Sequence, residues 1–408
     1  MTAQPNHLTT AERSKHHVLV PDAHAIGMIA VIRSLGRAGY TVHACASKPE
    51  ALGLSSSFAS HQVVCPAYDD RMFLPWLSTY VAQHGIRTIV PSEGFLLGVR
   101  PAFETYAAMM PIPSNPNLVY GSLSKSAVIA RLLETPETAA YLPPTLLWSA
   151  GEPLPVADQL EALGLPLFVK GDGADDTVAG DNIVVREESA DGAHKRLIEL
   201  SGRYRRVLVQ GFVPGQGTGA YFLIHKGEIV QEFMNRCIHE VPHTGGFCSL
   251  RESWWHEPMM ADARVKIRHL GWEGVAMIEY RWDPDTDQFW FIELNARFWA
   301  ALHVALYAGV DFPKQLLDLR HGAPVARITA FPLGLQVRYT VPFEVGYVMS
   351  RWKDKSLPFG QRVRSVVGWF ARFLNPTIRS DLAFPGDRKL YFSAWRTFLW
   401  RMFGPGDA

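Results

Sequence analysis

The side chains best suited to chemistry lie at the end of one apolar segment. Residues 289–294 read FWFIEL, an aromatic and aliphatic run typical of a buried strand. Alternate residues of a strand face the same way, so we expect Glu293, Asn295 and Arg297 to emerge together. Carboxylate and amide oxygens are the ligands that Mg²⁺ prefers, and a guanidinium binds phosphate or a developing negative charge. The pattern favours a magnesium and phosphate site over its alternative, a solvated polar face on an edge strand.

A second carboxylate is expected beside this set. Residues 275–280 form another apolar run, which carries Glu279, and the turn-rich residues 283–287 (DPDTD) follow it. A hairpin through that turn would bring Glu279 next to Glu293. Two carboxylates and an amide at the end of a sheet would suit a nucleotide with two Mg²⁺ ions.

Composition bounds the remaining possibilities. The chain has 408 residues, of which 48% are hydrophobic, and it carries 40 Lys or Arg against 39 Asp or Glu, a globular composition with room for two to four domains. Its four cysteines (Cys45, Cys65, Cys237 and Cys248) form no CxxC pair and no metal-ligand spacing, so we expect buried or incidental thiols. The polar N-terminus lacks the apolar core of a signal peptide, and no apolar run reaches membrane-spanning length, so we expect a cytoplasmic protein.

The first part of the chain alternates strands and helices. Residues 17–20 and 41–45 are expected strands, separated by a helix over 26–38 that ends at Gly39, and a helix over 73–83 precedes a strand over 86–90. This order predicts a doubly wound parallel sheet, but a lone Gly27 is not a dinucleotide fingerprint. Ser92 and Glu93 follow a strand end, so they are either substrate contacts or the start of a helix.

The middle of the chain holds an ordered series of further candidates. After the proline-rich linker 111–116, Lys125 opens a helix that reaches Leu133, and a strand over 163–170 ends in Lys170. A loop rich in Gly and Asp follows at 171–182, and the segment 206–219 contains QGFVPG, which begins at Gln210.

This series, completed by Glu279 and Glu293-x-Asn295-x-Arg297, resembles the ATP-grasp superfamily, in particular its carboxylate–amine ligases. The resemblance covers about residues 122–320, and more loosely the domain before them. It implies ATP and Mg²⁺ (or Mn²⁺) as cofactors. The implied nucleotide-binding residues are Lys125, Lys170, Gln210, Gly211, Phe212, Val213 and Asn295, the implied metal ligands are Glu279, Glu293 and Asn295, and the implied catalytic residues are Arg297, Arg236 and Lys170.

Three departures from the family pattern bear on nucleotide binding. Ser124 stands where an Asp usually precedes the first lysine, and Gly217 stands where an acid often holds the ribose. The expected lid loop carries four aspartates, which would repel a triphosphate unless they point outward or hold a metal (Asp172, Asp175, Asp176 and Asp181).

The resemblance implies an N-terminal α/β domain over 1–115, an ATP-grasp domain over 116–325 with a lid at about 165–209, and a C-terminal extension over 326–408. The implied reaction is an ATP-dependent ligation of a small-molecule carboxylate and an amine through an acyl phosphate, which releases ADP and phosphate. An ATP-grasp phosphotransferase and a nucleotide-binding protein without catalysis are the alternatives. Nothing indicates a nucleic-acid partner.

Two regions of the sequence each have two possible interpretations. His239 and His243 are expected on a loop near Arg236, either as bases or metal ligands or as solvated side chains. The tail from 351 to 408 holds eleven Lys or Arg and four Asp or Glu, and it contains two amphipathic helices over 361–374 and 392–403. These basic helices either pack their apolar faces on the rest of the protein or make a peripheral contact with an anionic membrane.

Overall fold

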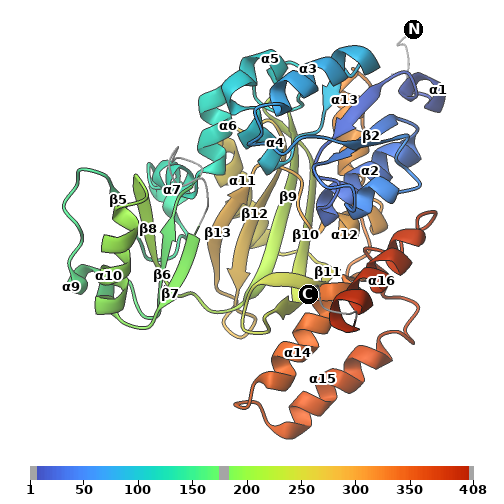
Figure 1. Ribbon diagram of the computed structural model, residues 1–408. Helices are drawn as coiled ribbons and strands as arrows, with labels where there is room; N and C mark the ends of the chain where they lie inside the picture. The colour runs from blue at the N-terminus through green and yellow to red at the C-terminus, as the bar shows by residue number, and fades with distance from the viewer. Residues whose placement is uncertain (1–6, 174–182, 404–408) are drawn as a thin grey trace. The chain divides into compact units, whose positions relative to one another are not determined.

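A computed structural model describes residues 7–173 and 183–403 (Figure 1). The chain forms two compact units. Unit 1 contains Met1–Pro111, Phe222–Trp255 and Arg297–Ala408, and unit 2 contains Ile112–Tyr221 and His256–Ala296. Each unit is therefore built from segments far apart in the sequence.

Unit 1 begins with a parallel sheet in the order β3-β2-β1-β4, shown in blue in Figure 1. Its strands are β1 (His17–Val20), β2 (Thr41–Ala46), β3 (His61–Val64) and β4 (Thr88–Ile89), with α2 (Ile26–Ala38) and α3 (Phe73–His84) as the longer helices between them. The left-handed Gly39 (φ 98°) ends α2. The expected α/β fold class and parallel opening are confirmed.

The start of α2 packs closely on a distant part of unit 1. A Cβ on Gly27 would lie 2.5 Å from the carbonyl oxygen of Trp299, so only glycine fits there. α2 also contacts α12 (Leu302–Tyr307) and α13 (Phe312–Arg320). The lone glycine of the first loop therefore serves helix packing.

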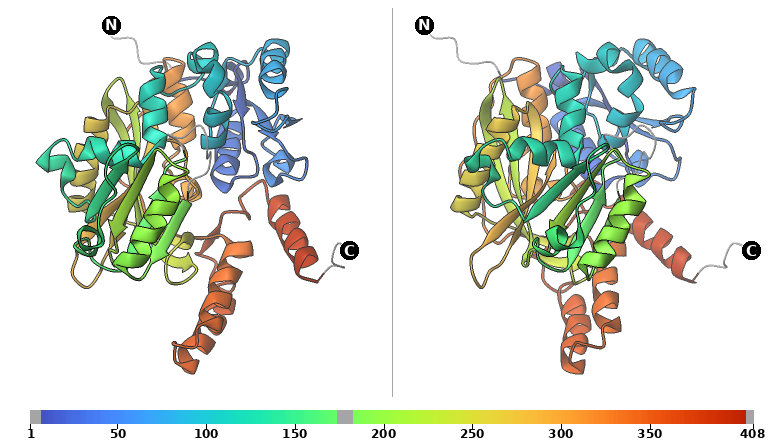
Figure 2. Two further views of the ribbon diagram at one scale, coloured as in Figure 1. Left: turned by 60° about the vertical axis from the view of Figure 1, so that its left-hand side comes forward. Right: turned by 90° about the vertical axis from the view of Figure 1, so that its left-hand side faces the viewer.

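The C-terminal part of unit 1 combines an antiparallel ladder with three helices. β10 (Glu228–Val241) pairs with β11 (Phe247–Ser253), β11 with β14 (Gln336–Arg338), and β14 with the short parallel β15 (Arg379–Ser380). α14 (Val345–Lys353) and α15 (Phe359–Ala371) lie side by side, and α16 (Lys389–Phe403) follows (Figure 2). The expected tail helices are therefore present. Shorter helices of unit 1 are α1 (Thr10–Arg13), η1 (Leu52–Ser55), α4 (Glu93–Gly98), η2 (Arg100–Ala102), α5 (Phe103–Ala107) and η3 (Thr340–Glu344).

Unit 2 contains a four-stranded antiparallel sheet in the order β5-β8-β6-β7. The strands are β5 (Thr145–Ser149), β6 (Leu167–Gly171), β7 (Ile183–Glu187) and β8 (Arg206–Gly211), and α10 (Ala190–Ser201) packs on them through Ala193, Leu197 and Leu200. The unit also holds the hairpin β12 (Gly274–Trp282) and β13 (Phe289–Asn295), and strand β9 (Gln216–His225) contains the division between the units. Its other helices are α6 (Pro116–Leu123), α7 (Lys125–Leu132), α8 (Pro136–Ala139), α9 (Ala157–Glu161) and α11 (Glu257–Leu270).

Among the helices that the structure describes, none is long and apolar enough to cross a membrane.

Candidate functional site

The hairpin of β12 and β13 brings two acidic residues face to face. Glu279 is the register partner of Glu293, and Met277 is the partner of Asn295. Directly opposite residues of an antiparallel pair point to the same face about 5 Å apart. The expectation that the turn over 283–287 would bring Glu279 beside Glu293 is confirmed.

Lys125 reaches this hairpin from the start of α7. Its Nζ lies 2.6 Å from Oε2 of Glu293, while Nδ2 of Asn295 donates to Oε1 of the same carboxylate at 2.9 Å. Ser124 fixes the start of α7, because its hydroxyl accepts a hydrogen bond from the backbone N–H of Ala127 at 3.1 Å. A lysine, a carboxylate and an amide therefore form one connected group.

Lys170 stands near the end of β6 and belongs to the same electrostatic cluster. Its Nζ donates to Oε1 of Gln210 at 2.6 Å. Burial lowers the pKa of Lys170 to about 8, and the charge of Lys125 lowers it too, whereas Glu293 and Glu279 raise it. Two lysines and two carboxylates of unit 2 thus influence one another.

Gln210 on β8 is oriented from both sides. Lysine can only donate, so the amide oxygen faces Lys170, and Nε2 of Gln210 donates to Oγ1 of Thr145 at 3.0 Å. A side chain predicted to contact adenine therefore also positions the lysine.

Backbone hydrogen bonds fix the position of the segment that follows Gln210. The N–H of Gly211 donates to the carbonyl of Pro144 and that of Phe212 to the carbonyl of Pro166, both at 2.9 Å. A Cβ on Gly211 would lie 2.0 Å from the carbonyl oxygen of Leu163, so the position requires glycine. The Phe212 side chain is 48% exposed, which leaves an aromatic face open beside the predicted adenine contacts.

Asp172, the first of the four loop aspartates, is turned away from solvent. Its Oδ2 accepts hydrogen bonds from the hydroxyl of Ser124 at 2.7 Å and from the backbone N–H of Ser126 at 2.8 Å. It therefore holds the first turn of α7, and it brings a carboxylate to the position at which Ser124 replaces the usual Asp. The other three aspartates, Asp175, Asp176 and Asp181, lie outside the described residues.

The donor set fits a hard divalent cation. Glu279, Glu293 and Asn295 offer oxygens on one hairpin, next to the ammonium group of Lys125. Within residues 7–173 and 183–403, no cluster of three or more His, Cys, Asp or Glu side chains is suited to a metal. Two carboxylates and an amide suit Mg²⁺, because this ion keeps several positions for water and substrate phosphate.

The two predicted catalytic arginines belong to unit 1, where each pairs with an acid. Nε of Arg297 lies 2.8 Å from Oε2 of Glu93, and Nε of Arg236 lies 2.7 Å from Oε1 of Glu252. Ser92 is the N-cap of α4 and accepts from the N–H of Phe95 at 3.2 Å, so the capping interpretation of Ser92 holds.

The segment around Arg236 is a strand, so the expected loop is wrong for His239, whereas His243 does lie in the turn after β10; neither side chain is solvated, which the expectation had favoured. His239 is buried on β10, where its Nδ1 lies 2.8 Å from Oε1 of Glu344 and its ring stacks on Tyr347. His243 follows β10 and pairs with Asp354 at 2.9 Å. Each histidine has an acidic partner that lies more than 100 residues away in the sequence.

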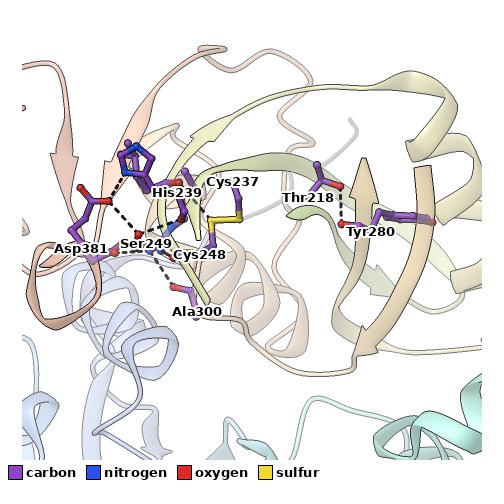
Figure 3. Close-up of a disulfide and its surroundings, with 11 residues drawn as sticks. Thr218, Cys237, His239, Cys248, Ser249, Tyr280, Ala300 and Asp381 are labelled. Carbon is purple, nitrogen blue, oxygen red and sulfur yellow. Dashed lines mark hydrogen bonds and ion pairs between the residues drawn. A yellow bond between two sulfur atoms is a disulfide. The ribbon is translucent and has the colours of Figure 1, made fainter. Parts of the chain in front are cut away.

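The expectation of incidental thiols is wrong for two cysteines. Cys237 on β10 and Cys248 on β11 form a disulfide (Figure 3). The pairing is not regular here, because the register shifts twice between Cys237 and Glu240. Cys45 and Cys65 are free and buried, as expected.

Comparisons with known proteins agree on the fold. No family model matches the chain. Acetyl-CoA carboxylase of Schizosaccharomyces pombe is 29% identical over 134 residues, and that of Saccharomyces cerevisiae is 29% identical over 135 residues; these matches cover 32% and 33% of this chain but 6% of each carboxylase.

Three solved structures are similar over 78% of the chain. One is a biotin carboxylase–β,γ-ATP complex from Campylobacter jejuni, with a TM-score of 0.59 and 16% identity over 74% of that chain. Another is an L-amino acid ligase from Bacillus licheniformis, with a TM-score of 0.54 and 14% identity over 74% of that chain. The third is the biotin carboxylase domain of a Hydrogenobacter thermophilus 2-oxoglutarate carboxylase with MgADP and bicarbonate, with a TM-score of 0.56 and 14% identity over 73% of that chain. The chain therefore has the ATP-grasp fold.

Proposed function

We propose that this protein is an ATP-dependent ligase that joins a carboxylate to an amine through an acyl phosphate and releases ADP and phosphate. The observation that carries the proposal is the cluster in unit 2, in which Lys125, Lys170, Glu279, Glu293 and Asn295 interact. Such a mixture of lysines and hard oxygen ligands suits a nucleoside triphosphate with its Mg²⁺.

Each member of the cluster has a role in this reaction. Lys125 and Lys170 would contact the phosphates and neutralise charge as the γ-phosphoryl group leaves ADP. Glu279, Glu293 and Asn295 would hold Mg²⁺, which supplies positive charge to the phosphate oxygens. Gln210 would keep Lys170 oriented, with Gly211 to Val213 beside the adenine.

The chemistry needs positioning more than a protein nucleophile. An oxygen of the substrate carboxylate attacks the γ-phosphorus, the bond to the ADP oxygen breaks, and an acyl phosphate forms. The amine nitrogen then attacks the acyl carbon, phosphate leaves, and the nitrogen loses a proton to give the amide. Holding the reactants in line supplies most of such a rate enhancement.

Arg297 and Arg236 are proposed to bind the γ-phosphoryl group or the substrate carboxylate. Each guanidinium pairs with one carboxylate oxygen within unit 1, and a guanidinium that binds a carboxylate also suits a phosphate. Arg297→Ala should therefore lower ADP formation strongly while the protein stays folded.

Two other activities are consistent with parts of this picture. The similarity to biotin carboxylases, one of which contains bicarbonate, favours bicarbonate as the acid and biotin as the acceptor. The unusual acidic loop and Gly217 favour a nucleotide-binding protein without turnover. A phosphotransferase that stops at a stable phosphorylated product remains the other alternative in this fold.

A screen for ADP release distinguishes these activities. The protein is incubated with MgATP and a panel of carboxylic acids, with bicarbonate, and with each acid plus an amine, and products are identified by mass spectrometry. Ligation requires ADP that depends on both an acid and an amine, together with an amide product. ADP release with bicarbonate plus biotin favours carboxylation, and a stable phosphorylated product without an amine favours phosphotransfer. ATP binding without turnover across the whole panel would contradict the proposed enzyme.

A further inference from the structure

A basic cavity lies between α14 and α15 in unit 1. It encloses about 420 Å³, and its lining includes three arginines, namely Arg351 on α14 and Arg364 and Arg372 on or just after α15. No Asp or Glu occurs among the described residues that line it. A volume of this size is enough for a small organic ligand.

The buried acid next to the cavity does not neutralise it. Glu344 lies behind His239, with its Oε1 2.8 Å from Nδ1 of that ring and its Oε2 3.4 Å from Nη2 of Arg338. Arg338 is buried and does not line the cavity, so it balances the charge of Glu344. The three lining arginines therefore remain an excess of positive charge.

Two of the arginines are held in place by neutral partners. Nε of Arg351 donates to Oγ of Ser365 at 2.7 Å. Nη2 of Arg372 lies 3.2 Å from Nε2 of His239; because arginine can only donate, Nε2 accepts and Nδ1 donates to Glu344. Neutral partners orient the guanidiniums without neutralising their positive charge, and this arrangement favours an anionic ligand.

We propose that this cavity binds a phosphate group, either of a soluble organic phosphate or of a lipid headgroup. Three guanidiniums around one volume match the several acceptor oxygens and the double negative charge of a phosphomonoester. The residues that line this cavity differ from those of the proposed nucleotide site, so the two proposals can fail separately.

The test titrates the full-length protein with two probes in the presence of saturating MgADP. Glycerol 1-phosphate is followed by calorimetry, and vesicles of phosphatidylcholine with phosphatidic acid are followed by co-sedimentation. Arg364→Gln should weaken binding of the active probe about tenfold, because it removes one charge-assisted contact. Arg71→Gln is the matched control, since this exposed arginine precedes α3 and does not line the cavity.

The outcomes of this test distinguish a soluble organic phosphate from a lipid headgroup. Binding of glycerol 1-phosphate that Arg364→Gln weakens identifies a soluble phosphate, and binding of the acidic vesicles alone, with the same dependence on Arg364, identifies a headgroup. If neither probe binds, or if Arg364→Gln and Arg71→Gln behave alike, the cavity is not a phosphate site.

A second observation concerns the opposite face of α15. The apolar residues Phe359, Val367 and Phe370 lie on one helical face, at i, i+8 and i+11, and they are 64%, 59% and 60% exposed. None of the residues of α15, all of which are described, is buried. The alternative that the tail packs on the protein applies instead to α16, whose Trp395 and Phe398 contact the cluster around Ile26 and Leu390.

We infer that this face of α15 lies on an anionic membrane surface. Arg362 flanks the apolar face, Lys353 is exposed at the end of α14 and Lys355 in the turn after it, so the charge complements anionic lipid. Val367→Ser combined with Phe370→Ser should reduce co-sedimentation with phosphatidylserine vesicles at least fivefold, whereas Leu333→Ser, which changes an exposed leucine elsewhere, should not. Binding should also fall with salt and be absent with neutral vesicles. Full-length protein that stays in the supernatant with anionic vesicles would contradict this inference.

Discussion

The unusual ionisation of Lys170 leads us to expect that MgATP binding at the proposed site depends on pH. Its pKa is about 8, because burial disfavours the ammonium form and Lys125 repels it. At pH 7 about nine-tenths of this side chain is charged, and at pH 9 about one-tenth is, whereas an ordinary lysine with a pKa near 10.4 stays charged throughout. If the ammonium group binds the phosphates, the Kd for MgATP should rise about tenfold from pH 7 to pH 9.

The pH dependence of stability has the opposite sign, so a loss of affinity at high pH is not caused by unfolding at Lys170. Burial disfavours the charged lysine in the folded protein, so below pH 8, where Lys170 is charged in both the folded and the unfolded state, it lowers the free energy of unfolding by its full amount. This destabilisation disappears as pH rises from about 8, the pKa in the folded protein, toward 10.4, the pKa of an ordinary lysine. The contribution of Lys170 to the stability of the fold therefore rises with pH, whereas nucleotide binding is expected to weaken. ATP itself contributes little above pH 7, because a terminal phosphate has its second pKa near 6.

Direct binding is the right assay, because it avoids the ionisation of the amine substrate. MgATP affinity is measured by calorimetry from pH 7 to 9.5 at constant ionic strength. Lys170→Arg keeps a permanent charge and should remove the alkaline loss of affinity, whereas Lys195→Arg, an exposed lysine on α10, should retain it. An affinity that is constant between pH 7 and 9 in the native protein, or a loss that persists in Lys170→Arg, would refute the role of this lysine.

Three further predictions concern the cluster and the fold. Glu293→Gln should abolish ADP formation while the circular dichroism spectrum stays native, and near-normal turnover would remove this residue from the metal site. Asp387→Ala should lower the free energy of unfolding by about 3–5 kcal/mol in denaturant titrations, because it leaves the buried Arg33 without its acid, 2.8 Å away; an effect under about 1 kcal/mol would contradict this. Alkylation of the denatured, unreduced protein should modify two thiols, not four, since Cys237 and Cys248 are joined; four modified cysteines would exclude the disulfide.

Local patterns in the sequence were enough to predict the elements that carry the cluster. The turn over 283–287 closes a hairpin, so Glu279 and Glu293 could be predicted to be neighbours, whereas the register shift between Glu279 and Tyr280 that makes them direct partners could not. The helix from Ile26 to Ala38 ends where Gly39 adopts a left-handed conformation, which is a strong local signal.

Partners chosen by tertiary structure could not be predicted in this way. The disulfide depends on shifts of register between β10 and β11, and no periodicity in the sequence encodes them. Asp172 looked like a lid residue because of its glycine-rich surroundings, yet its partners are Ser124 and Ser126, more than 40 residues earlier. The pairing of His239 with Glu344 likewise spans 105 positions and leaves no local trace.

The most direct test of the proposed reaction follows oxygen from the carboxylate. A substrate acid identified in the ADP-release screen is labelled with ¹⁸O in its carboxylate and incubated with MgATP, the amine and the protein, and the inorganic phosphate is analysed by mass spectrometry. Because the carboxylate oxygen that attacks the γ-phosphorus leaves with the phosphate, the proposed mechanism predicts one ¹⁸O atom in each phosphate released. Phosphate without label, formed together with the amide, would contradict an acyl-phosphate intermediate.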